Sequence, residues 1–254
     1  MYYCCAVTNA GKRSHNEDAF LAGKIVLSQA SIETKENAPF IVGVADGVAG
    51  ENTGEIASKM ALSQLKSAVF SDENDLKNIV LAIHDNLRIY GLSHDSCANM
   101  QTTVCALAVA EDGCAYSVNV GDSRMYHFYK GEVRQVTKDQ SLVQLLYDAG
   151  EITGDEIKNH AKKHMIFPVL GNLTAPPCPD IDKIGRLSPG EIIIVCTDGV
   201  SDYLSKQDFE DILSLKKPLI YRLETLIKHA LNSGGSDNLT VAAVTESGGD
   251  GYEE

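Results

Sequence analysis

Six acidic residues stand beside apolar runs of the sequence, at positions from which carboxylates can bind metal ions or orient water. Two of them directly precede the apolar stretch that begins at residue 19, three follow apolar runs, and one precedes the last apolar run. These residues are Glu17, Asp18, Asp46, Asp122, Asp198 and Asp237. In antiparallel sheets the end of one strand lies beside the beginning of its neighbour, so we expect these acids to converge on one edge.

A hairpin turn is the simpler interpretation of an Asp-Gly pair, because this pair is a common signal for a short turn between two strands. Asp46-Gly47 and Asp198-Gly199 are each followed by a segment with turn and helix character. Neither pair has a second strand for a tight hairpin to join. The pattern therefore favours a functional site over a turn at both positions.

Several carboxylates on one rim repel each other unless they are protonated or share cations. The chain has a formal net charge of −13, so an anionic ligand such as phosphate would also need local cations. Oxygen ligands select hard ions, Mg²⁺ or Mn²⁺, over zinc. Two such ions about 4 Å apart can share one water, lower its pKa and clamp both oxygens of a displacement at phosphorus.

The elements that would position these acids change in character along the chain. The run 39–45 is continuously apolar, as expected of a buried strand, and the segments 52–70 and 75–91 carry apolar residues at helical spacing. Gly91 is an expected helix C-cap. The runs 102–110, 114–122 and 124–137 predict successive strands of an antiparallel meander, with turns at 111–113 and 130–131.

The second half of the chain continues this alternation. The segment 141–153 predicts a helix, 191–200 a buried strand that ends in Asp-Gly, 221–232 a helix and 238–245 a last strand. Helices, a meander, more helices and a closing strand predict an α+β fold in which helices cover a sheet core.

Length and composition predict one domain, residues 1–246, followed by an acidic tail at 247–254 that we expect to be disordered. The apolar runs are too short to cross a bilayer, and the N-terminus lacks a signal-peptide pattern. The seven cysteines are odd in number and scattered, without a C-x-x-C pair, which favours reduced, mostly buried thiols over disulfides or zinc. We therefore expect a cytoplasmic protein, and a monomer.

The acidic balance, with an isoelectric point near 4.9, argues against binding to nucleic acid or to an anionic membrane. No segment supplies a basic stripe. Arg13 is a cation close to Glu17 and Asp18 in the sequence, and its planar guanidinium can hold two phosphate oxygens.

Five motifs together resemble the metal-dependent protein phosphatase family (PPM, protein phosphatase 2C) in its compact bacterial members. They are "GKRSHNEDAF", "VGVADGVAG", "TTVCALAV…VNVGDSRMY", "IIIVCTDGVSD" and "GGSDNLTVAAV", in the family's order and spacing. The resemblance spans about residues 3–244. It implies an α-β-β-α sandwich of two antiparallel sheets flanked by helices.

The resemblance also implies roles for individual residues. Asp46 would bridge two ions, Mn²⁺ or Mg²⁺, with the Gly47 carbonyl on one of them and Asp198 and Asp237 on the other. Asp122 with Asp198 resembles the pair that holds a third ion in bacterial members. By the same resemblance, Glu17 and Asp18 would orient metal-bound waters. Arg13 would bind the substrate phosphate, and Asn238 would support the site from beside Asp237.

Three positions depart from the family pattern. Val48 stands where many members have a histidine that resembles a general acid, which leaves protonation of the leaving group to a water or to another residue. Gln101 stands where the family often has glycine. In the segment 159–172, where bacterial members carry a flap, Phe167-Pro168 replaces part of an Arg-rich run.

His160 and His164 are four residues apart and could hold zinc on one helical face, but the glutamate of H-E-x-x-H and a third ligand are missing. Solvated side chains are the favoured interpretation of this pair.

The sequence therefore predicts a protein-serine/threonine phosphatase that hydrolyses phosphoserine and phosphothreonine with a metal-bridging hydroxide and so reverses the action of a serine/threonine kinase. No cysteine nucleophile is needed. The alternative is a catalytically silent protein that keeps the fold to bind a kinase or another regulatory partner. A third candidate is a phosphatase of the same fold dedicated to one regulatory protein.

Overall fold

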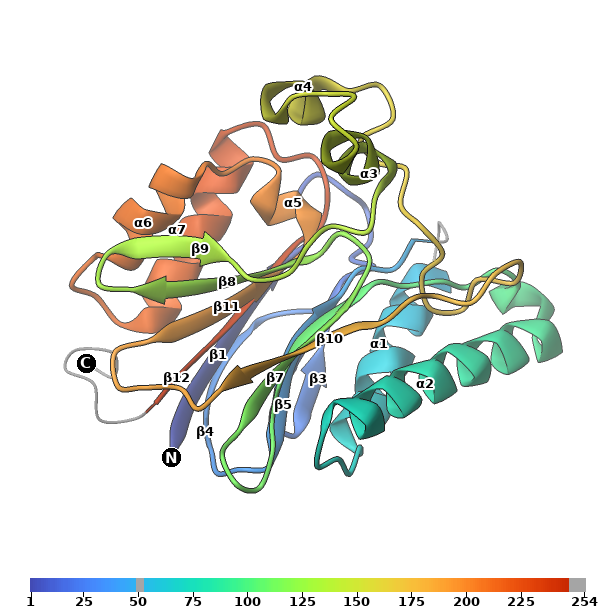
Figure 1. The fold of residues 1–254 in the computed structure, drawn as a ribbon, viewed down its shortest axis with the longest axis horizontal. Coiled ribbons are helices and arrows are strands. Elements are labelled where there is room, and N and C mark those ends of the chain that lie inside the picture. Colours follow the sequence, from blue (N-terminus) through green and yellow to red (C-terminus); the bar gives the residue numbers. More distant parts are fainter. Residues whose placement is uncertain (49–52, 247–254) are drawn as a thin grey trace.

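Two six-stranded antiparallel sheets pack face to face, and helices cover the outer face of each (Figure 1). This computed structural model describes residues 1–48 and 53–246, so the predicted acidic tail at 247–254 lies outside the described residues. The predicted four-layer α-β-β-α architecture is confirmed. It places three hydrophobic cores in series, one between the sheets and one under each helical layer.

The first sheet has the strand order β4-β1-β12-β11-β8-β9. Its strands are β1 (Tyr2–Asn9), β4 (Ser31–Glu36), β8 (Arg124–Tyr129), β9 (Glu132–Gln135), β11 (Ile192–Cys196) and β12 (Leu239–Glu246). The chain's first and last strands, β1 and β12, pair along their whole length, from Tyr2 with Glu246 to Asn9 with Leu239. This pairing brings residues near position 10 next to residues near position 238.

The second sheet has the order β10-β7-β6-β5-β2-β3. Its strands are β2 (Ala19–Ala22), β3 (Ile25–Leu27), β5 (Phe40–Ala45), β6 (Val104–Val109), β7 (Ala115–Val120) and β10 (Asp180–Gly185). Strands β2, β5, β6 and β7 are buried at every position, because one face meets the other sheet and the other face meets helices.

Two long helices, α1 (Thr53–Lys66) and α2 (Glu73–Ser93), pack on the second sheet, and a short 3₁₀ turn, η1 (Asp95–Cys97), follows them. Helices α6 (Lys206–Leu213) and α7 (Leu219–Asn232) cover the first sheet. Figure 1 shows the short helices α3 (Leu142–Asp148) and α4 (Gly154–Asn159) projecting at one end, near α5 (Asp198–Ser201).

The predicted continuous meander is wrong in one respect. Strands β6 and β7 pair in the second sheet, whereas β8 and β9 pair in the first. Both predicted hairpin turns are present, but between β7 and β8 the chain crosses from one sheet to the other at residues 121–123. Gly121 has a φ of +112°, which permits this change of direction and places Asp122 at the crossing.

Gly91 is not the C-cap of its helix, since α2 continues to Ser93. A Cβ atom at this position would lie 3.0 Å from the carbonyl oxygen of Cys97, so the glycine allows η1 to pack closely against α2. The helix predicted at 52–70 is described from Thr53 and ends at Lys66.

All seven cysteines are free thiols, and six of them are buried, as predicted; Cys178 is exposed. Among the described residues, none of the helices combines the length and apolar character that a membrane span requires.

Candidate active site

Asp46 and Gly47 follow β5, where the strand meets the N-terminal end of α1. The backbone of Asp46 is fixed on both sides: its N–H donates to Thr103 Oγ1 at 3.0 Å, and its carbonyl accepts from Thr102 Oγ1 at 2.9 Å. A Cβ atom at position 47 would lie 2.2 Å from the carbonyl oxygen of Gly54. Glycine at position 47 is therefore needed for this close approach.

Asp198 follows β11 and begins the single turn of α5, beside the loop that enters β12. A Cβ atom on Gly199 would lie 1.9 Å from the carbonyl oxygen of Asn238, so only glycine lets the two segments come this close. The approach brings Asp198 next to Asp237, although the two are 39 positions apart in the sequence.

Asp18 is buried immediately before β2, between the two sheets. Its Oδ2 atom accepts hydrogen bonds from Thr197 Oγ1 at 2.9 Å and from Thr240 Oγ1 at 2.7 Å. Its Oδ1 atom is buried and has no hydrogen-bond partner. A buried carboxylate oxygen without a donor is costly, which indicates that a ligand or water completes the site.

Glu17 and Asn238 join the loop before β2 to the loop before β12. Asn238 Oδ1 accepts from the Glu17 backbone N–H at 2.8 Å, and its Nδ2 donates to the carbonyls of Ala10 and His15. Like Asp18, Glu17 has one buried carboxylate oxygen, Oε1, without a partner. Asn238 therefore sets the position of the loop that carries both acids.

The structure brings together the predicted acids from five different segments of the chain. Burial and the neighbouring carboxylates raise the pKa of Asp18 to about 7 and that of Asp198 to about 6. Burial, followed by repulsion from Asp18, Asp198 and Asp122, raises the pKa of Asp46 well above its usual range. The pKa of Asp122 is also raised, first by burial and then by Asp198.

No Lys or Arg forms an ion pair with Asp18, Asp46, Asp122 or Asp198 in the part of the chain that the structure describes. Converging carboxylates without protein cations, together with the two orphaned oxygens, fit divalent metal ions with oxygen ligands. The donor set therefore suits Mg²⁺ or Mn²⁺.

Arg13 lies at the outer side of this cluster, where its Nη2 atom donates to Asp237 Oδ2 at 2.9 Å. The Arg13 side chain is 59% exposed. The ion pair with Asp237 raises the pKa of Arg13, so the guanidinium stays charged. One face of the acid cluster thus carries a cation that is accessible to a ligand.

Near Asp122 and Asp198, Arg124 is largely buried and is held by two carboxylates. Its Nε atom donates to both oxygens of Asp139 at 3.0 Å, and its Nη2 atom donates to Asp139 Oδ2 at 2.7 Å and to Asp202 Oδ1 at 3.2 Å. Lys163 also lies 3.7 Å from Asp202 Oδ2. These acids are neutralised by the protein itself.

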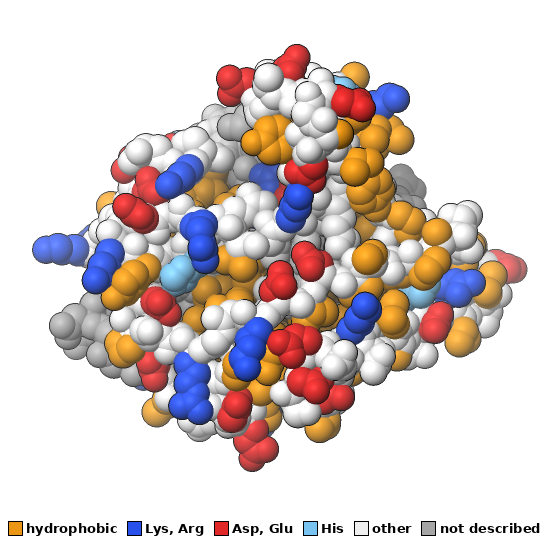
Figure 2. Space-filling model, viewed as in Figure 1, with side chains coloured by type: hydrophobic (Ala, Val, Ile, Leu, Met, Phe, Trp, Pro, Cys, Tyr) orange, Lys and Arg blue, Asp and Glu red, His pale blue; other side chains and the backbone are white. Residues whose placement is uncertain are grey.

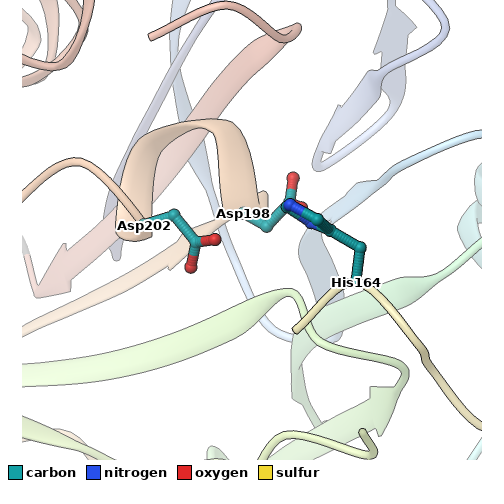
Figure 3. A group of neighbouring side chains, drawn as sticks. All are labelled: His164, Asp198 and Asp202. Carbon is teal, nitrogen blue, oxygen red and sulfur yellow. The ribbon is translucent and has the colours of Figure 1, made fainter. Parts of the chain in front are cut away.

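His164 lies beside Asp198 and Asp202, with one ligand atom of each within 4.8 Å of the others. Figure 3 shows the imidazole and the Asp198 carboxylate facing each other, with His164 on the segment that follows α4. His160 does not belong to this group. The predicted solvated character fits the exposure of His164, but its position at the acid cluster was not predicted from the sequence.

Sequence reasoning also missed Asp202 and the two threonines that bind Asp18. Asp202 stands four residues after Asp198, within the quoted motif "TDGVSD", and this spacing on a helical turn could have indicated a shared face. Thr197 and Thr240 depend on the register of β11 with β12, which local patterns do not specify.

A family model described as "Protein phosphatase 2C" matches residues 9–233 of this chain. The chain belongs to the protein phosphatase 2C family. Among its relatives is "Serine/threonine phosphatase stp" of Listeria welshimeri, which is 30% identical over 248 residues and covered to 93%, as is this chain.

Solved structures of serine/threonine phosphatases share the fold over nearly the whole of this chain. A Streptococcus agalactiae serine/threonine phosphatase superposes with a TM-score of 0.81 and 29% identity, with 100% of both chains covered. The catalytic domain of the serine threonine protein phosphatase PstP, in complex with 2 manganese ions, gives a TM-score of 0.77 and 28% identity over 96% of this chain and 99% of the catalytic-domain chain.

Proposed function

We propose that this protein phosphatase 2C chain hydrolyses phosphoserine and phosphothreonine in proteins, using divalent metal ions held at the acid cluster. One observation carries the proposal: carboxylates from four loops, with Asp18 fully buried among them, converge without protein cations and leave two carboxylate oxygens unpaired. The relatives named serine/threonine phosphatases support the choice of substrate class.

In this proposal Asp46 and the Gly47 carbonyl hold one ion, and Asp46, Asp198 and Asp237 hold a second. A third ion would lie between Asp122 and Asp198. His164 is close enough to Asp198 to supply a nitrogen ligand there, whereas the oxygens of Asp202 already face Arg124 and Lys163. Mn²⁺ is favoured over Mg²⁺, because PstP, a structural relative, was solved with manganese.

Bound divalent ions would supply charge neutralisation at the phosphate and a water of lowered pKa. The chain's own residues do the rest. Arg13, exposed and charged, turns its guanidinium from Asp237 toward two phosphate oxygens, a fork that a lysine ammonium cannot imitate. Asp18 Oδ1 and Glu17 Oε1 are the acceptors that orient waters of the site, and Asn238 holds their loop.

Val48 has an aliphatic side chain, which cannot donate a proton to the leaving group. It is 40% exposed beside the site. The proton for the leaving serine or threonine oxygen therefore comes from a water in this proposal. The substrates are phosphorylated proteins made by a serine/threonine kinase, and the enzyme acts as a cytoplasmic monomer. The single catalytic domain extends over residues 1–246.

The direct test uses purified protein and a phosphothreonine peptide. With Mn²⁺ we expect hydrolysis, and a chelator should abolish it. Asp198→Asn should remove activity while circular dichroism shows an intact fold. Asp211→Asn is the matched control, because Asp211 is an exposed acid of α6 whose carboxylate accepts from Gln207, and it should keep wild-type activity.

The same experiment separates the alternative, a catalytically silent protein that binds a kinase or regulatory partner. If calorimetry shows Mn²⁺ binding while the wild type stays inactive over a range of Mn²⁺ and Mg²⁺ concentrations, the silent function replaces the phosphatase. The named relatives give no support to that alternative.

A further inference from the structure

His84 is a buried histidine of α2 that no step of the proposed reaction uses. Its side chain belongs to a residue only 3% exposed, and its Nδ1 atom accepts a hydrogen bond from the backbone N–H of Gly171 at 3.1 Å. An accepting Nδ1 requires a neutral imidazole with its proton on Nε2. Burial lowers the pKa of His84, which keeps the ring in this form.

Gly171 lies where the flap segment 159–172 returns to the body of the protein. It has a φ of +84°, and a Cβ atom there would lie 2.2 Å from the carbonyl oxygen of Met100. The backbone at Gly171 is therefore pressed against the strand entrance at residues 100–102. His84 supplies the acceptor that this buried amide would otherwise lack.

The neighbouring residue, Leu170, extends this contact toward the metal site. Leu170 and Thr102 exchange two backbone hydrogen bonds, each 3.1 Å. Thr102 in turn donates its hydroxyl to the carbonyl of Asp46 at 2.9 Å and pairs with Gly47. The contact between His84 and Gly171 is therefore linked to the backbone of Asp46 and Gly47, two proposed metal ligands, through Leu170 and Thr102.

Gln101, the departure from the family's glycine, forms a second attachment. Its Oε1 atom accepts from Asn172 Nδ2 at 3.0 Å, and its carbonyl accepts from the Val48 N–H at 3.0 Å. We call residues 169–172, with their contacts to His84, Gln101 and Thr102, the clamp.

The part of the flap segment that precedes the clamp also contacts the body of the protein. Before residue 169 the chain bonds back to the body through Phe167 N–H to the Gln140 carbonyl at 2.9 Å, and it carries His164 to the Asp198 side of the cluster. Met165 and Phe167 of this segment are exposed. Figure 2 shows hydrophobic side chains gathered on one face of the molecule, below α3 and α4 as they lie in Figure 1. One short segment therefore borders the site at both Asp46 and Asp198.

We propose that His84 is a positioning residue: through Gly171 it holds the clamp against Thr102 and so fixes Asp46, Gly47 and the flap segment for metal binding and catalysis. The inference rests on the proposed function for its catalytic part, whereas its metal-binding part is independent of activity. Residues that orient metal ligands from outside typically change affinity or activity by about 10- to 100-fold when removed.

The test compares His84→Leu with His84→Asn, whose Oδ1 can stand where Nδ1 accepts. We expect His84→Leu to weaken Mn²⁺ binding, measured by calorimetry, by about tenfold and to lower kcat by a similar factor. Hydrogen exchange at the Gly171 amide should accelerate. His84→Asn should restore the slow exchange and most of the Mn²⁺ affinity.

Leu76→Val is the matched control, because it removes one buried methylene group from the same helix two turns away. It should lower stability and leave Mn²⁺ affinity and kcat unchanged. If His84→Leu fails to fold, Gln101→Ala tests the clamp from its partly exposed side, with a smaller loss in the same direction.

Wild-type Mn²⁺ affinity and kcat in a folded His84→Leu protein would overturn the proposal. An equal loss in Leu76→Val would overturn it too, since the effect would then follow general stability. An inactive wild type would refute the proposed function instead, and the Mn²⁺ affinities and the Gly171 exchange would still decide the role of His84.

Discussion

Two neighbouring groups of acids in this protein are neutralised in different ways. Asp139 and Asp202 surround the guanidinium of Arg124, with several hydrogen bonds between 2.7 and 3.2 Å. Asp18, Asp46, Asp122 and Asp198 lie in the adjoining cluster, and none of them has an ion-pair partner among the residues described.

This difference separates acids whose charge the folded chain neutralises from acids that need bound cations. A carboxylate with a protein cation has its charge compensated in the folded chain, and removal of that cation is strongly destabilising. A buried carboxylate without one repels its neighbours, and its pKa rises, as at Asp18 and Asp46. Such a group destabilises the empty protein and favours the binding of divalent ions.

Removing the internal cation gives the largest expected loss of stability. Arg124→Met leaves Asp139 without its counter-ion and Asp202 with only Lys163, 3.7 Å away, and breaking a buried pair from one side costs about 3–5 kcal/mol. Urea unfolding of the metal-free protein measures this loss. Arg13→Met is the matched control, because its pair with Asp237 is exposed and should contribute less than about 1 kcal/mol. Similar losses of unfolding free energy in Arg124→Met and Arg13→Met would contradict the distinction between the buried and the exposed ion pair.

The pH dependence of the unfolding free energy of the metal-free protein tests the group of acids without an ion-pair partner. An aspartate in the unfolded chain has a pKa of about 3.9, whereas the pKa of Asp18 in the folded protein is raised to about 7 and that of Asp198 to about 6. Between these values the folded state binds more protons than the unfolded state, so stability falls as the pH rises.

We expect a decrease of about 2 kcal/mol or more between pH 4 and pH 7, since each pKa unit is about 1.4 kcal/mol. Denaturant unfolding at a series of pH values with chelator measures it. Repeating the series with Asp18→Asn should flatten the curve. Stability that rises over this range in the wild type would show that the cluster is already neutralised.

Arg13→Lys should give the smallest effect. It keeps the charge but loses the fork that holds two phosphate oxygens, and one charge-assisted hydrogen bond corresponds to about a tenfold change in kcat/KM. The free energy of unfolding should change by less than about 1 kcal/mol. Steady-state kinetics on a phosphothreonine peptide measures the first quantity, and an unchanged kcat/KM would remove Arg13 from the phosphate site.

Much of the fold and of the acid cluster could be predicted from the sequence. Asp46 and Asp198 end apolar runs, and Asp237 precedes one, so alternating apolar patterns locate them at strand ends. Antiparallel pairing then brings strand ends together. The structure bears out that convergence, including Asp18 at the entrance to β2.

Other features depend on contacts between elements that local patterns do not encode. The chain crosses between sheets at Asp122, which the uniform strand character of 102–137 concealed. The hydroxyls of Thr197 and Thr240 reach Asp18 only because β12 pairs with both β1 and β11. The bond between His84 and Gly171 joins residues 87 positions apart and has no signature in either segment.

The central claim is that the unpaired acids form the site of divalent ions. Thermal unfolding of the wild type and of Asp46→Asn, with and without Mn²⁺ near neutral pH, tests it most directly. Without metal, Asp46→Asn should be at least as stable as the wild type, because it removes a buried charge. Mn²⁺ at 100 times its Kd should stabilise the wild type by about 2.7 kcal/mol and the variant much less. A wild-type transition that Mn²⁺ leaves unchanged, or equal stabilisation of both proteins, would contradict the account.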